Sequence, residues 1–200
     1  MLLKLLACAL ALVLVSDLTS AQWRGRQVQL QEYHDVCMAS NSPFRVANGQ
    51  EAGQPAATNM KMLKWDDKLA RTAQNLANAC IFQHDSCRHY PDLLVGQNMG
   101  WKWINGKINK DKLLTLLGGK IEESINDWYN EVRNFNPANV ISYQKNPAVG
   151  HYTQLVWAET NRIGCGAVKY SQGVKHNLML VCNYAPSGNI GGMPVYKTSN

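Results

Sequence analysis

The chain has 200 residues, of which 46% are hydrophobic and 17% charged, a composition that is typical of one globular domain. It excludes a disordered chain, a collagen-like chain and two sizeable cores. Lys and Arg number 20 against 14 Asp and Glu, which leaves a formal net charge of +6. A positive excess favours anionic neighbours such as sulfated polysaccharides, acidic lipids or nucleic acids, but does not choose among them.

The first 21 residues have the order of a secretory signal peptide. Lys4 gives a basic start, residues 5–15 are apolar, and small residues precede the cleavage site expected after Ala21. The uncharged run between Lys4 and Asp17 is 12 residues long, whereas a membrane anchor needs about 20. We therefore expect residues 1–21 to be removed, no transmembrane anchor, and a secreted, extracellular domain over residues 22–200.

The new amino terminus would begin with a basic arm, Arg24-Gly25-Arg26, whose glycine provides a hinge. The arm is similar to the Arg-Gly-Asp tripeptide of integrin ligands. That tripeptide needs an aspartate carboxylate on a metal ion, and Arg26 carries the opposite charge. The arm is therefore only a weak candidate for a recognition element.

Secretion favours disulfides over metal-binding or redox cysteines. After removal of the signal peptide five cysteines remain, so that at most two intrachain disulfides form. They are Cys37, Cys80, Cys87, Cys165 and Cys182.

Hydrophobic spacing predicts three helices. Residues 27–39 show loose helical spacing, and a long polar loop follows over residues 40–58. Asp66 can cap a second helix, and a third places Glu131 close to its apolar face. The predicted buried stripe of the second helix consists of Leu69, Ala73, Leu76, Ala77 and Cys80. The predicted face of the third consists of Ile121, Ile125, Trp128 and Val132.

Between these helices, residues 101–112 interleave tryptophan and lysine: Trp101, Lys102, Trp103, Lys107, Lys110 and Lys112. The favoured interpretation is a solvated loop with one or two indole rings against the core. The alternative is a surface patch that binds anionic ligands, and heparin-like polymers are the first candidates. Nucleic acid is not expected as a partner of a secreted protein. Binding to heparin should weaken steeply with salt.

The last part of the chain predicts an antiparallel hairpin. Residues 164–170 and 178–184 are strand-like and flank a turn that contains Gly173. Symmetric pairing about this turn sets Cys165 opposite Cys182, near the separation that a disulfide requires. We expect that bridge. Cys37 then competes for Cys80 or Cys87, and the sequence leaves the choice open.

Two runs resemble the signature stretches of the CAP superfamily of cysteine-rich secretory, antigen 5 and pathogenesis-related proteins. They are Gly150-His-Tyr-Thr-Gln-Leu-Val-Trp-Ala-Glu-Thr160 and Met179-Leu-Val-Cys-Asn-Tyr-Ala-Pro-Ser-Gly-Asn-Ile190. Shorter matches lie at residues 59–61, 65–66, 83–88, 95–98 and 128–132. The resemblance covers nearly all of residues 22–200 and is nearest to insect antigen 5 proteins of venom and saliva.

This resemblance implies an α+β fold: a three-layer α-β-α sandwich with a C-terminal antiparallel hairpin. It also implies a cleft lined by a His-Glu-Glu-His tetrad, matched here by His84, Glu131 and His151. Gln97 stands where many members have glutamate, and an amide cannot act as base, acid or anionic ligand. No cofactor is required, but His84 and His151 could hold a divalent metal such as zinc.

Three functions follow as hypotheses. The first is a non-enzymatic secreted protein that binds a host receptor, a matrix polymer or a lipid, with platelet inhibition or vasoactivity as one outcome. The second is a metal-assisted hydrolase with His84 and His151 as ligands and Glu131 as base. The third is an allergen-like structural protein without a dedicated partner. The missing nucleophile, the amide at Gln97 and the basic charge favour the first.

Overall fold

A computed structural model describes residues 53–199 of the chain. The predicted signal peptide, the Arg24-Gly25-Arg26 arm and the predicted helix at 27–39 lie outside these residues. The main elements are β1 (Lys64–Trp65), α4 (Asp67–Ala79), β2 (Gly96–Asn105), α5 (Lys110–Asn130), α6 (Gly150–Leu155), β3 (Arg162–Gln172) and β4 (Lys175–Ala185). Short 3-10 helices are η2 (Glu131–Asn134), η3 (Pro137–Val140) and η4 (Pro147–Val149).

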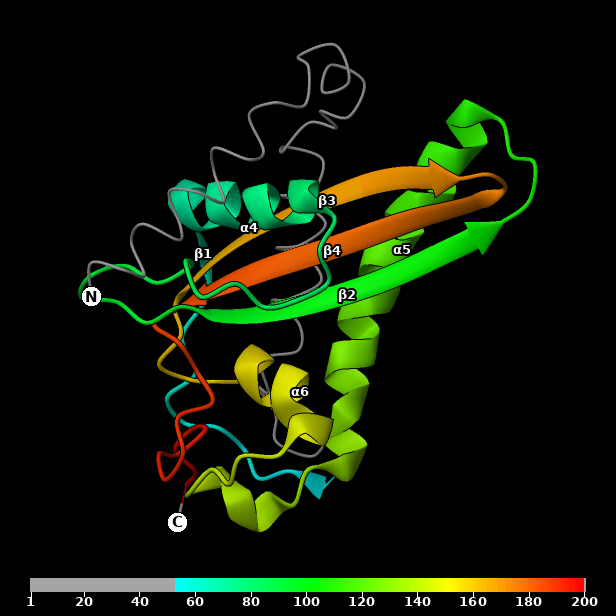
Figure 1. The fold of residues 1–200 in the computed structure, drawn as a ribbon. Coiled ribbons are helices and arrows are strands. Elements are labelled where there is room, and N and C mark those ends of the chain that lie inside the picture. Colours follow the sequence, from blue (N-terminus) through cyan, green and yellow to red (C-terminus); the bar gives the residue numbers. More distant parts are fainter. Residues whose placement is uncertain (1–52, 200) are drawn as a thin grey trace.

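The four strands form one mixed sheet in the order β1-β3-β4-β2. β1 pairs with β3 in parallel, while β3, β4 and β2 are antiparallel neighbours. Helix α4 lies on one face of the sheet, and α5 and α6 lie on the other (Figure 1). The expected three-layer α+β sandwich is therefore confirmed, and β2 forms one edge of the sheet.

Helix α4 starts where the sequence predicts. The Asp66 side chain accepts hydrogen bonds from the backbone N–H groups of Lys68 and Leu69, which satisfies donors that the first turn leaves unpaired. Leu69, Ala73 and Ala77 are buried as expected. The prediction for Cys80 was wrong. It follows the helix as a left-handed C-cap with φ 56°, and this conformation turns its side chain out of the buried stripe to an exposed position.

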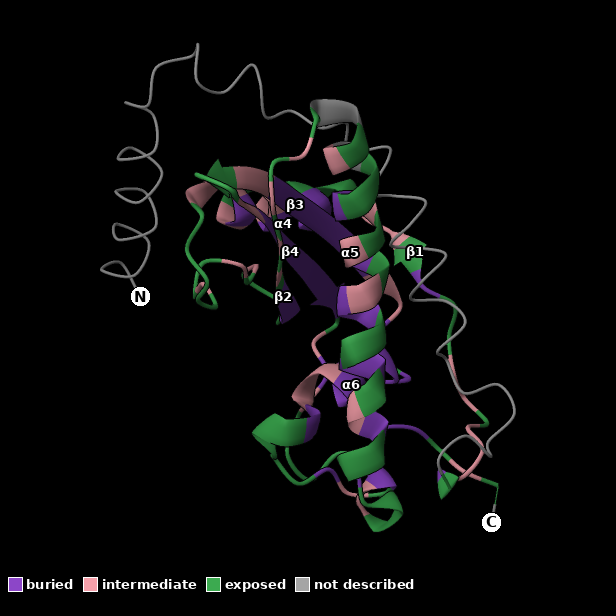
Figure 2. Cartoon of the chain, turned by 90° about the vertical axis from the view of Figure 1, so that its right-hand side faces the viewer, coloured by how far each residue is buried: buried purple, intermediate pink, exposed green. Residues whose placement is uncertain are grey.

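Helix α5 begins at Lys110, well before the apolar face that predicted it. Ile121, Ile125 and Trp128 are buried against the sheet, whereas Val132 is buried beyond the helix end, in η2. In Figure 2 the exposed side of α5 faces the viewer and the buried strands lie behind it. Among the described residues, no helix combines the length and the apolar character needed to cross a bilayer.

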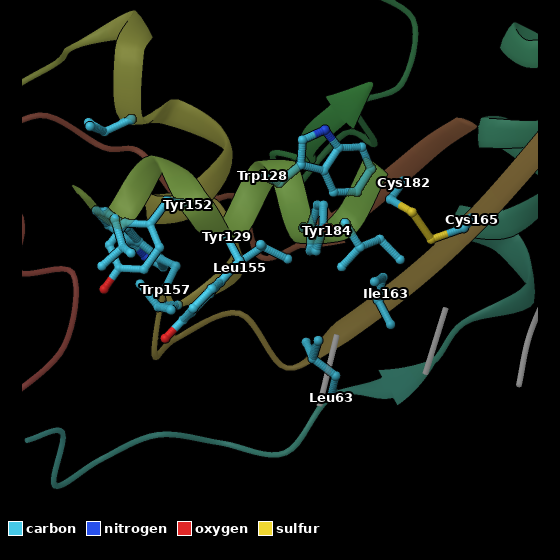
Figure 3. Packing of buried hydrophobic residues seen from close by; sticks show 14 of the residues in the cluster. Leu63, Trp128, Tyr129, Tyr152, Leu155, Trp157, Ile163, Cys165, Cys182 and Tyr184 are labelled. Atoms are coloured by element: carbon cyan, nitrogen blue, oxygen red, sulfur yellow. A yellow bond between two sulfur atoms is a disulfide. The ribbon is translucent and has the colours of Figure 1, made fainter. Parts of the chain in front are cut away.

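The predicted hairpin is formed by β3 and β4, joined by Gly173 and Val174, with Gly173 at φ +62°. Cys165 lies directly opposite Cys182, and the two form a disulfide within the core. Figure 3 shows this bridge beside Tyr184 of β4 and Trp128 of α5. The register of the hairpin thus links its two strands covalently under α5.

The other cysteines are only partly described. Cys87 belongs to a disulfide, and Cys80 carries a thiol whose Sγ lies 3.7 Å from the carbonyl oxygen of Asn78. Cys37 lies outside the described residues, so its pairing stays a prediction.

The Trp-Lys stretch is not the solvated loop that the sequence favours. Trp101, Lys102 and Trp103 belong to β2, which pairs with β4 along its whole length. Side chains alternate between the two faces of a strand. Lys102 therefore reaches Glu123 and Asp127 of α5, and the two indoles lie on the α4 side of the sheet.

Candidate functional site

Glu131 lies at the end of α5 and serves as the anchor of α6. Its Oε2 accepts hydrogen bonds from the backbone N–H groups of His151 (2.9 Å) and Tyr152 (3.1 Å). Its Oε1 accepts from His151 Nδ1 at 2.6 Å. A carboxylate at a helix N-terminus is favoured because the first-turn N–H groups have no partner within the helix. One side chain therefore fixes both the start of α6 and the imidazole that it carries.

His151 is held by a ring contact as well as by this carboxylate. Its imidazole stacks on the indole of Trp128, with centroids 5.8 Å apart and planes 15° from parallel. Because Glu131 can only accept, Nδ1 carries the proton, and Nε2 is the ring nitrogen that remains for another partner. About a third of the side chain, 34%, is exposed to solvent.

His84 and Gln97 form a second hydrogen-bonded pair. His84 Nδ1 donates to Gln97 Oε1 at 2.8 Å. The Gln97 amide nitrogen donates to Asn183 Oδ1 at 2.9 Å and to Asp85 Oδ2 at 3.4 Å. Since both amide hydrogens have acceptors, the orientation of Gln97 is determined by its neighbours. Asn183 in turn donates to the Leu69 carbonyl of α4.

The start of β2 connects the two pairs. Gln97 faces Asn183 and α4, while the next residue, Asn98, donates from Nδ2 to the carbonyl oxygen of His151 at 3.1 Å. Adjacent strand residues point to opposite faces. The structure thus places the four predicted residues as two separate hydrogen-bonded pairs on opposite sides of the edge strand β2, whose residues Gln97 and Asn98 link them.

Two further side chains hold the signature segments in place. Gln154, buried in α6, accepts from the backbone N–H of Gly188 at 2.9 Å and donates to Thr160 at 3.2 Å. Thr153 donates to Asn189 at 2.7 Å. Sequence reasoning named neither these residues nor Asn98, Asp85 and Asn183 as parts of the site, although all of them lie in or beside the quoted runs.

The described part of the chain has no ready cluster of metal-binding side chains. It contains no group of three or more His, Cys, Asp or Glu side chains arranged around a common point, whereas protein zinc sites use three or four such ligands. The Glu131 carboxylate and the Gln97 carbonyl oxygen are already used as acceptors within their pairs. The ring nitrogens that these hydrogen bonds leave for a metal ion are the Nε2 atoms of His84 and His151. Zinc binding by these two histidines stays a prediction.

The same hydrogen bonds weaken the hydrolase hypothesis. A general base must direct a lone pair at the water that it deprotonates. All three bonds to Glu131 come from protein N–H groups that fix α6. Oε1 keeps one lone pair, but taking up a proton from a water would neutralise the carboxylate and weaken the charge-assisted hydrogen bonds that hold α6.

Comparison with known proteins identifies the family to which this fold belongs. Residues 21–184 match the model of the CAP family, described as the cysteine-rich secretory protein family. The chain belongs to this family. It is 41% identical to Venom allergen 5 of Vespula maculifrons over 178 residues, which cover 84% of this chain and 73% of that protein. It is also 41% identical to Venom allergen 3 of Solenopsis invicta, covering 80% and 65%.

Solved structures show the same fold. The Schistosoma mansoni venom allergen-like protein 4 has a TM-score of 0.62 and 29% identity, covering 83% of this chain and 94% of that one. BmVAL-1 has a TM-score of 0.69 and 27% identity, covering 87% and 85%. A zinc-containing structure of NaASP2, at 22% identity and a TM-score of 0.63, shares the fold alone.

The environment of Gln97 predicts the effect of Gln97→Glu. The introduced carboxylate would lose both amide donors and face the Asp85 carboxylate, one oxygen of which is buried without a partner. We expect the unfolding free energy in urea to fall by about 2 kcal/mol at pH 7. Burial and the like charge should raise the pKa of the introduced group, so the deficit should shrink as the pH falls towards 5. A deficit that grows on acidification would contradict this account.

Proposed function

We propose that this protein is a secreted, non-enzymatic binding protein that acts on a host receptor, a matrix polymer or a lipid. The observation that carries the proposal is the use of Glu131. The only carboxylate of the predicted tetrad is occupied as the acceptor of three N–H groups of the α6 segment. Glu131 therefore has a structural role, because its hydrogen bonds hold α6 in place. The amide of Gln97 cannot act as an acid or a base.

The relationship to venom allergens supports action outside the producing cell. Relatives at about 41% identity are named venom allergens, and residues 1–21 have the order of a signal peptide. We extend the proposal to host haemostasis, with platelet inhibition or vasoactivity as the effect. The Hookworm Platelet Inhibitor, at 17% identity and a TM-score of 0.57, has the same fold. It gives a reason to choose platelets as the first assay.

The test uses the secreted protein, whose amino terminus should be Gln22. It is added to washed platelets stimulated with collagen or ADP, and aggregation is followed by light transmission. We expect dose-dependent inhibition. Aggregation equal to that with buffer would overturn the anti-haemostatic part of the proposal.

A parallel assay tests the absence of catalysis. Peptide and ester substrates are incubated with the protein, with and without added zinc, beside His151→Ala. We expect no rate above buffer in any sample. A rate that zinc raises and His151→Ala abolishes would overturn the non-enzymatic proposal and establish the hydrolase in its place.

A further inference from the structure

An aromatic face lies on the part of β2 that α4 leaves uncovered. We define it by Phe82, Trp101, Trp103, Lys175 and Asn177. The strands continue well past the end of α4 (Figure 1), which packs on β3 and β4. Trp101 and Trp103 are 40% and 52% exposed, and Phe82, 51% exposed, has its ring centroid 5.9 Å from that of Trp101. Clustered exposed aromatic rings are typical of ligand-binding surfaces.

A lysine lies over both indoles. Lys175 Nζ is 5.4 Å from the ring centroid of Trp101 and 4.7 Å from that of Trp103. This arrangement holds the ammonium in place through cation–π attraction. The ion pairs among the side chains that the structure describes, which exclude those of residues 110, 111 and 114, do not include Lys175, whereas Lys102 is paired with Glu123 and Asp127 on the opposite face of β2. The positive charge over the rings therefore remains for an external anion.

Beneath the rings is a buried amide with an unused donor. Asn177 is fully buried and accepts a hydrogen bond from Trp101 Nε1 at 3.1 Å. Its Nδ2 has no acceptor among the described residues. Asn177 is the cross-strand partner of Trp103, so this donor lies in the same row as the exposed indole. Buried donors normally have partners, and a ligand oxygen that enters beside Trp103 would supply one.

A hollow of about 430 Å³ lies beyond this face, at the ends of the strands beside the turn between β3 and β4. Its lining includes Lys107, Val174 and His176, the last two being the neighbours of Lys175 in the chain. Lys107 is exposed and belongs to none of the ion pairs formed by the described side chains, which do not include that of residue 111. A second cation thus extends the positive surface beyond the aromatic rings.

We propose that the aromatic face binds an acidic polysaccharide. The apolar face of a sugar ring packs on the indoles of Trp101 and Trp103, and a sulfate or carboxylate of the chain pairs with Lys175. The next acidic group reaches Lys107. The inference rests on the proposed function in that it names one matrix polymer, but its surface lies on the α4 side of the sheet, away from the Glu131–His151 pair. The unused amide donor of Asn177 favours a polar ligand over a lipid surface.

The test measures the affinity of the intact secreted chain for immobilised heparin at several salt concentrations. Trp103→Ala should weaken binding by about fivefold and leave the salt dependence nearly unchanged. Lys175→Gln should weaken it by about threefold at low salt and reduce the salt dependence. The matched controls are Ile141→Ala, an exposed apolar residue elsewhere, and Lys145→Gln, an exposed lysine elsewhere. Both controls should bind as the parent does, and neutral dextran should bind neither parent nor variants.

Thermal unfolding of each variant verifies that the fold is retained. Parental affinity in both Trp103→Ala and Lys175→Gln would overturn the proposal. So would Trp103-dependent binding to vesicles of anionic phospholipid in the absence of heparin binding, because the face would then be a membrane contact. Glu131→Gln should leave heparin affinity unchanged. Loss of heparin binding therefore tests this surface, whereas the platelet and hydrolysis assays test the proposed function.

Discussion

Replacement of Glu131 by glutamine should lower the unfolding free energy by about 3 kcal/mol, because charged acceptors contribute more than neutral ones to buried hydrogen bonds. The amide would direct its NH2 group at an N–H donor of His151 or Tyr152. The start of α6 would then lose part of its anchor. Urea unfolding followed by intrinsic fluorescence measures the loss, since Trp128 stacks on His151.

The matched control is Glu122→Gln, which makes the same charge change on the exposed side of α5. Its unfolding free energy should stay within about 0.5 kcal/mol of the parent. Equal effects of the two substitutions would show that net charge, and not the anchoring of α6, is responsible.

Gly166→Ala should lower the unfolding free energy by at least as much as Glu131→Gln, because it disturbs the packing of α4 on the sheet. A methyl group at Gly166 would overlap the backbone of Gln74 in α4. Gln74 is also tied to β3 through two hydrogen bonds with the backbone of Ala167, at 2.8 and 3.1 Å. Helix α4 could make room only by moving off the sheet. We expect a loss of about 3 kcal/mol, which corresponds to a fall in Tm of about 10 °C for a domain of this size.

Gly191→Ala provides the control, because no atom lies within 4 Å of the added carbon. Differential scanning calorimetry should show its Tm within about 2 °C of the parent. If the Tm of Gly166→Ala were also within about 2 °C of the parent, the packing of α4 on the sheet would not depend on its close approach to β3 at Gly166.

The sequence predicted those helices and strands that are determined by nearby residues, such as a helix cap, a repeating apolar spacing or a tight turn. The cap at Asp66 and the spacing of Leu69, Ala73 and Ala77 suffice for α4. The alternation on either side of Gly173 suffices for the hairpin and its disulfide. The first half of α5 was missed although Leu113 and Leu117 continue the four-residue spacing of Ile121 and Ile125, because its lysines were interpreted as part of a solvated loop. Strand β2 was missed because its lysine and two tryptophans were interpreted as part of a solvated loop, although Trp101 and Trp103 follow the two-residue period of a strand.

The sequence predicted which residues belong to the candidate site, but not how they pair. His84, Gln97, Glu131 and His151 came from the family resemblance, and their pairing depends on contacts that no spacing encodes. Glu131 meets His151 across 20 positions of the chain, and Gln97 meets Asn183 across 86. Hydrogen bonds of this range follow from the packing of α5, α6 and the sheet, so the use of Glu131 as an anchor becomes visible only in the structure.

The alternation of Gln97 and Asn98 makes the length of the preceding segment critical. An inserted or deleted residue between Arg88 and Gly96 that shifted β2 by one position would turn Gln97 towards α6 and Asn98 towards α4. Both histidine contacts would be lost in one step. Relatives that vary in length should therefore do so at the other end of the strand, around Gly106, where a change leaves this register intact.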